Sequence, residues 1–136
     1  MTTASWALQA AIHAALTEND GVLAVLGGPR IYDHVPRGMS YPFVTFGTTS
    51  ERDWSTGSDG GHEHIVILNV WSHANGRGQV QQIIEAVRTA LHDRPLVLDG
   101  YRLINLRHET ANTRREADGE RYSGTIRLRA VTEPTD

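Results

Sequence analysis

The sequence contains no cysteine and no lysine, and only 7% of its residues are aromatic. The lack of cysteine excludes disulfides, thiolate zinc sites, iron–sulfur clusters and cysteine nucleophiles. Because all thirteen basic residues are arginine, a P-loop lysine, a Schiff-base lysine and a lysine general base are excluded as well. No apolar run approaches the roughly 20 residues of a membrane helix, and no signal-peptide pattern opens the chain. We therefore expect neither a membrane span nor secretion.

The length and composition are those of one folded domain. A chain of 136 residues can bury a real core, and we expect residues 1–136 to form a single domain. Hydrophobic residues make up 39% of the chain and charged residues 21%, which is typical of globular proteins. The formal net charge of −3 gives no sign of a general affinity for nucleic acids.

Two segments have the spacing of amphipathic helices, with apolar side chains recurring three and four residues apart. In residues 4–18 this stripe consists of Leu8, Ala11, Ile12, Ala15 and Leu16. In residues 77–93 it consists of Val80, Ile83, Ile84, Val87, Ala90 and Leu91. Pro95 follows the second segment, where a helix is expected to stop. These segments predict the two main helices of the fold.

Most of the remaining chain alternates between strand-like and turn-like composition. Strands are predicted at residues 41–50, 62–73, 96–98, 101–108 and about 120–132, and a short strand or extended stretch at residues 30–35. Polar loops are predicted at residues 51–61 and 109–119. The nearly continuous apolar centre of 62–73 favours a central strand that is covered on both faces. The order of the main elements predicts an α+β fold, with an antiparallel or mixed sheet of about four to five strands and two main helices packed on it.

The residues do not form a recognisable catalytic or metal site. His62 and His64 share one face of a strand and could chelate a metal, but His73 has the opposite parity and cannot complete the set. A strand that starts with solvated histidines is the simpler interpretation. The nucleophile elbow of hydrolases and the ligand spacing of calcium loops are both missing. We therefore expect no catalytic residue, no bound metal, no cofactor and no enzymatic activity, with a metal-dependent hydrolase as the enzyme alternative.

Seven residues are candidates for an interface with a partner. Trp54 lies in a polar, glycine-rich loop, and tryptophan is enriched among buried interface anchors. Arg127 and Arg129 alternate along a strand and share a face, where they could meet phosphates or the carboxylates of a neighbouring subunit. The full set is Asp53, Trp54, Ser55, Arg114, Arg115, Arg127 and Arg129. A loop folded over its own core and a solvated strand face are the alternatives. The other two tryptophans, Trp6 and Trp71, are predicted to be core residues.

The order of several short segments resembles the small tail-completion, or tail-terminator, family of long-tailed phages and gene transfer agents. The resemblance covers about residues 4–132. It rests on Ile31-Tyr32-Asp33-His34-Val35-Pro36, Tyr41-Pro42-Phe43-Val44 with Gly47, Asp53-Trp54-Ser55-Thr56, His62-Glu63-His64, Val70-Trp71-Ser72, Gly76-Arg77, Leu91-His92, Leu96 to Gly100, and Tyr122 to Arg129. It is the ordered set, and no single segment, that carries the likeness.

The resemblance implies a structural protein that forms a ring, usually a hexamer, at the head-proximal end of a tail tube. Such a ring stops tube growth and joins the tail to the head. Its implied partners are further copies of the chain, the tail-tube protein and the head–tail connector protein, with DNA passing through the pore without sequence-specific binding and with no membrane. The implied location is the tail of a virion or phage-like particle assembled in the bacterial cytoplasm. A head–tail adaptor of the same particle is the alternative role.

Overall fold

The computed structural model describes residues 2–55, 60–73 and 76–135 and has an α+β fold. Its helices are α1 (Ala4–Thr17), α2 (Asp20–Leu26) and α3 (Gly78–Leu91). Its strands are β1 (Ile31–Tyr32), β2 (Phe43–Asp53), β3 (His62–Ser72), β4 (Val97–Leu98), β5 (Tyr101–Arg115) and β6 (Tyr122–Pro134). None of the helices in the described part of the chain is long and apolar enough to cross a bilayer.

The strands form one sheet in the order β1-β2-β3-β6-β5-β4. It is a mixed sheet, because β1 pairs with β2 in parallel while the other pairs are antiparallel. The predicted class and the mixed sheet are confirmed, but the predicted number of strands is too low. The sheet has six strands because the two-residue strands β1 and β4 each add a short pair at an edge.

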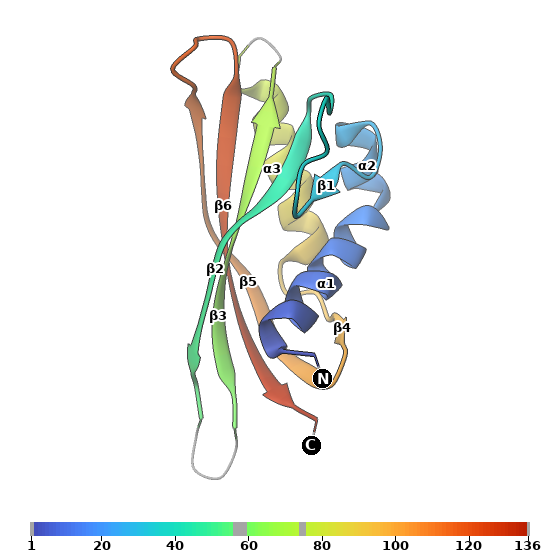
Figure 1. Cartoon of the computed structure of the whole chain (residues 1–136), viewed down its shortest axis with the longest axis vertical. Helices are drawn as coiled ribbons and strands as arrows, with labels where there is room; N and C mark the ends of the chain where they lie inside the picture. Colours follow the sequence, from blue (N-terminus) through green and yellow to red (C-terminus); the bar gives the residue numbers. More distant parts are fainter. Residues whose placement is uncertain (1, 56–59, 74–75, 136) are drawn as a thin grey trace.

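The helices cover one face of the sheet, as predicted (Figure 1). We call this the inner face; on β3 it carries Val66, Leu68 and Val70, which are buried, and the opposite outer face carries Ile65 and Ile67. α1 and α3 bury the apolar stripes predicted from the sequence against this inner face. Along the described chain no helix lies on the outer face, so the prediction that both faces of β3 are covered is wrong.

Two of the three tryptophans correct the sequence prediction of the core. Trp6 lies in the first turn of α1 and is 55% exposed. Trp71 lies on the outer face of β3, where it is half-buried and donates its indole N–H to Thr45 Oγ1 at 3.2 Å. Neither belongs to the core, because that core lies between the helices and the inner face.

Two long hairpins lie at opposite ends of the sheet (Figure 1). The β2–β3 hairpin continues through residues 51–53, because Glu51, Arg52 and Asp53 pair with β3. The β5–β6 hairpin continues to Arg115, which pairs with Tyr122. The predicted loops at 51–61 and 109–119 are therefore strands at 51–53 and 109–115, and residues 56–59 lie outside the described residues. The polar composition of these strands resembles that of a loop, because most of the side chains in residues 51–53 and 109–115 are exposed.

Candidate functional site

The predicted interface residue Trp54 belongs to a cluster on the outer face, at the end of the β2–β3 hairpin. Two guanidinium groups approach its ring; the ring centre is 5.1 Å from Cζ of Arg129 and 5.5 Å from Cζ of Arg52. The carboxylate of Glu63 accepts hydrogen bonds from both arginines, and its Oε2 is 2.6 Å from Arg129 Nε. Glu63 itself is buried. We refer to these four residues as the Trp54 cluster.

The Trp54 cluster is held together by charge as well as by stacking. Hydrogen bonds from Arg129 and then Arg52 keep the pKa of the Glu63 carboxyl below its ordinary value. With one carboxylate facing two guanidiniums, the cluster carries a net positive charge at neutral pH. Trp54 remains 41% exposed, so it is neither a core residue nor fully covered by its own chain. It presents an aromatic surface over a cationic base, which suits contact with a partner.

Asp53 and Ser55 shape the turn that follows β2. The backbone N–H of Ser55 donates to Asp53 Oδ1 at 3.1 Å, and its hydroxyl donates to the same oxygen. These bonds lower the pKa of the Asp53 carboxyl. Trp54 N donates to Gly61 O at 2.9 Å, which closes the base of the hairpin. Asp53 and Ser55 thus orient the backbone of Trp54.

The four predicted arginines do not form one patch. The β3–β6 register confirms that Arg127 and Arg129 share the outer face, opposite Ile67 and Ile65. Arg127 pairs with Glu109 at 2.9 Å and is separate from the Trp54 cluster. The sheet therefore divides this pair of arginines between two local ion-pair systems.

Arg114 and Arg115 lie at the other end of the sheet, near the tip of the β5–β6 hairpin (Figure 1). Arg114 pairs with Glu116 at 3.0 Å. The Nε of Arg115 donates to Gly119 O at a long 3.4 Å, and no ion pair to Arg115 is present among the described residues. The candidate interface residues thus form one group around Trp54 and one near the tip of the β5–β6 hairpin, and Arg127 lies between these two groups.

Arg52 and Glu63, two of the three charged members of the Trp54 cluster, were not predicted from the sequence. A signal for Arg52 was present, because residues two apart on a strand share a face and Arg52 precedes Trp54 by two. Glu63 lies between His62 and His64 in the sequence, and no ion pair was predicted for it. Its pairing with Arg129 depends on the β3–β6 register, which local spacing does not define.

The two histidines of β3 lie on the inner face, and their ring centres are 6.1 Å apart. The prediction of solvated histidines is wrong for His64, which is 1% exposed and has its Nε2 at 2.9 Å from Thr132 Oγ1. Burial is the main reason why the pKa of His64 lies below its ordinary value, although Glu51 opposes this shift. His73 lies elsewhere, beside Tyr41. Within the described ranges, no three histidine or carboxylate groups converge on a site for a metal ion.

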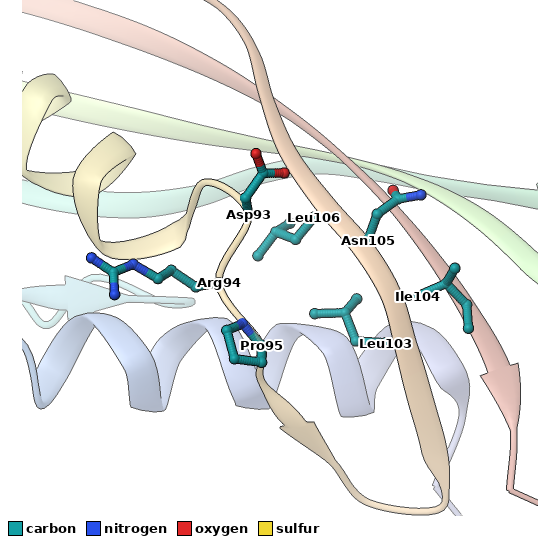
Figure 2. A pocket seen from close by; sticks show the side chains of 7 residues that line it. All are labelled: Asp93, Arg94, Pro95, Leu103, Ile104, Asn105 and Leu106. Atoms are coloured by element: carbon teal, nitrogen blue, oxygen red, sulfur yellow. The ribbon is translucent and has the colours of Figure 1, made fainter.

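A hollow of about 210 Å³ lies between β5 and the segment that connects α3 to β4 (Figure 2). Its lining residues are Asp93, Arg94, Pro95, Leu103, Ile104, Asn105 and Leu106. The lining supplies one carboxylate and one guanidinium but no hydroxyl, imidazole or second carboxylate, so it offers no nucleophile–base pair. The backbone N–H of Asp93 donates to Leu106 O at 2.8 Å and fastens the connector to β5. The hollow is formed by the packing of the α3–β4 segment against β5, and its lining residues contain no catalytic arrangement.

Comparison with known proteins relates the fold to particle tails. Residues 10–133 match the family described as tail completion protein gp17. A chain from the virion of a native gene transfer agent particle is similar in structure, with a TM-score of 0.90 and 28% identity over 98% of this chain and 99% of that one. The gp17 protein of bacteriophage SPP1 shares the fold, with a TM-score of 0.64 and 24% identity over 93% of this chain and 89% of that one. No curated protein matches the chain in sequence.

The family match covers nearly all of the fold. It begins within α1 and ends within β6, so it includes the Trp54 cluster and both hairpins. The similar chain from the gene transfer agent particle spans the same elements almost from end to end. On these grounds, the chain belongs to the tail completion protein gp17 family.

Proposed function

We propose that this protein is a tail terminator, which forms a ring of six copies on the head-proximal end of a tail tube. In this position it stops growth of the tube and joins the tail to the head. The main support is the family match over residues 10–133, together with the end-to-end likeness to a chain of a gene transfer agent virion. The role is structural, and we infer that the protein catalyses no reaction.

The distribution of surface features suits a ring subunit. Contacts on two different surfaces of one chain, repeated about an axis, close into a ring. The Trp54 cluster and the arginine-bearing hairpin tip offer two such surfaces at opposite ends of the sheet. We infer that further copies of the chain, the tail-tube protein and the head–tail connector protein are the partners.

The overall charge suits a channel through which DNA passes. Each chain has a formal charge of −3, so a ring of six copies at −3 each carries −18. A net negative ring repels the DNA backbone and disfavours a tight grip on it. We therefore infer passage of DNA without sequence-specific binding.

The direct test is to image particles made in cells that lack this protein. We expect tails of abnormal length that are not joined to heads, and normal particles when the gene is supplied again. Binding of the purified protein to tail-tube protein and to connector protein, measured separately, distinguishes a terminator from an adaptor. Joined tails of normal length in the deletion strain contradict the proposal, and binding only to head-side proteins favours the adaptor role.

A further inference from the structure

Each end of the sheet has a long edge without a neighbouring strand in the described chain. On one side, β4 covers β5 only at Tyr101 and Arg102. The segment between α3 and β4 then bonds to the β5 backbone. Asp93 N donates to Leu106 O at 2.8 Å, and His108 N donates to His92 Nδ1 at 2.9 Å. Beyond these contacts β5 continues to Arg115 with mostly exposed side chains and no described strand beside it.

The other side of the sheet repeats this arrangement at the opposite end. Here β1 covers β2 only at Val44 and Thr45. A bulge between Phe46 and Thr49 follows, and β2 then runs to Asp53 with all its side chains exposed. We call residues 49–53 the β2 edge and residues 111–115 the β5 edge. Neither contains proline, the residue that most effectively blocks pairing of an exposed strand.

These two edges cannot meet within one chain, because β3 and β6 lie between β2 and β5. They can meet between copies. β2 and β5 run in opposite directions along the sheet, so an edge of one copy can pair with that of the next as an antiparallel ladder (Figure 1). Such a contact uses different surfaces on the two copies, and a contact of this type builds a ring when the rotation between copies closes.

We propose that the β2 edge of each copy pairs antiparallel with the β5 edge of its neighbour, so that the sheet continues from subunit to subunit around the ring. This inference rests on the proposed ring and identifies the contact that builds it. Backbone hydrogen bonds provide the common part of such strand addition, and side chains select the register. The occupant of each open edge is accordingly a second copy of this chain.

The side chains define one favoured register. Facing residues of a ladder share a face, so the outer residues Ser50 and Arg52 must oppose the outer residues Asn112 and Arg114. Alignment of Arg52 with Arg114 places like charges opposite each other. A shift of four residues from that alignment brings Asp53 opposite Glu109, which again places like charges opposite each other. The register between them has no like charges directly opposed. Its pairs are Thr49–Arg115, Ser50–Arg114, Glu51–Thr113, Arg52–Asn112 and Asp53–Ala111.

The same register also brings opposite charges together. Glu51 becomes a diagonal neighbour of Arg115, within reach of long side chains. Each has only a weak contact within the described part of its own chain: Arg115 has the 3.4 Å bond to Gly119, and Glu51 lies 3.7 Å from the buried His64. Arg52 and Arg114 are also diagonal there, but their own chain already pairs them, with Glu63 and Glu116.

Disulfide trapping tests the register, and the chain has no native cysteine to interfere. In Ser50→Cys/Arg114→Cys the two thiols face each other only between copies. The matched control, Ser50→Cys/Thr110→Cys, uses the same strands and face but lies four residues out of register. Because a disulfide requires Cα atoms within about 7 Å, oxidised tails should contain at least about tenfold more reducible oligomers for the first pair than for the control. We expect the largest disulfide-linked oligomer to contain as many copies as the ring.

The outcomes separate this inference from the proposed function. Rings that are visible on tails but contain only monomer after oxidation overturn the strand pairing and leave the terminator role intact. Tails that carry no ring when made with the natural sequence overturn both. Charge reversal gives a second measurement if the cysteine variant does not assemble. Glu51→Arg alone should reduce assembly, and addition of Arg115→Glu should restore it; a double variant as defective as the single one contradicts the register.

Discussion

The guanidinium group of Arg129 lies over the ring of Trp54, 5.1 Å from its centre. Arg52 approaches the same ring, and Glu63 holds both arginines in place. The tryptophan is therefore fixed without being buried. A partner that covers this ring meets a preorganised surface, which lowers the cost of ordering side chains on binding.

Trp54→Ala should reduce the stability of the isolated chain only modestly. Two exposed cation–π contacts contribute roughly 1–2 kcal/mol together, which is less than the roughly 3–5 kcal/mol lost when a buried tryptophan is truncated. Joining of tails to heads should fall much more, and Trp54→Phe should retain part of it. Thermal melting of the purified chain beside a particle-assembly assay measures both effects. A large loss of stability with normal assembly would show that Trp54 serves its own domain.

The parts of the fold that the sequence predicted are those with one buried face. The α3 stripe and the alternation of β6 are visible in the sequence because one side of each element lies in the core. The extension of β5 through Ala111 and Asn112 is not visible, since both of its faces are largely exposed and composition alone resembles a loop. This extension is a strand because it pairs with β6 in the hairpin, and such pairing cannot be recognised from local composition.

The candidate site was predicted as separate pieces. Trp54 and Arg129 were each proposed from their own segment, because nothing local relates a residue after β2 to one in β6. The pairing of β2 and β6 with the central strand β3 brings them together, and Glu63 on β3 joins Arg129 to Arg52. Burial of His64 was missed for a similar reason, since its partner Thr132 lies on β6.

Gly124 provides a test of how closely α3 packs on the sheet. A methyl group at this position would lie 2.7 Å from Val80 Cγ1 and 2.9 Å from Ile84 Cδ1. Gly124→Ala must displace α3 or its side chains, and overpacking of this kind costs roughly 1–3 kcal/mol. Gly78→Ala is the matched control, because nothing lies within 4 Å of its added methyl group. Chemical denaturation should show a lower midpoint for the first variant only; equal midpoints contradict close packing of α3.

Asp118 organises the tip of the β5–β6 hairpin. Its Oδ1 accepts hydrogen bonds from Glu120 N at 2.9 Å and Arg121 N at 3.0 Å, and these bonds lower the pKa of its carboxyl. Asp118→Ala should increase amide hydrogen exchange at residues 120 and 121 and leave the global melting temperature nearly unchanged, because the tip is remote from the core. Asp118→Asn keeps the oxygen acceptor and should retain most of the protection. Unchanged exchange in the alanine variant would contradict this role.

His64 should make the protein less stable in mild acid. Its pKa in the folded protein lies below the ordinary value of 6.5, chiefly because of burial and despite the nearby Glu51, while His62 lowers it further. The unfolded chain therefore takes up a proton near pH 6.5, before the folded chain does. Stability is unaffected by this group above that pH and falls as the pH drops below it, by at most about 1.4 kcal/mol per pH unit.

His64→Gln removes this titration and keeps a polar group beside Thr132. The free energy of unfolding of the variant, measured by urea denaturation at several values between pH 7.5 and 5 (about the window set by an ordinary imidazole), should depend less steeply on pH than that of the natural sequence. Some acid sensitivity should remain, because burial also lowers the pKa of His108. His34→Gln is the matched control, since it removes an exposed imidazole and leaves the core intact. Parallel pH profiles for His64→Gln and the natural sequence would show that the folded protein accommodates a charged His64, with Glu51 as the group that stabilises it.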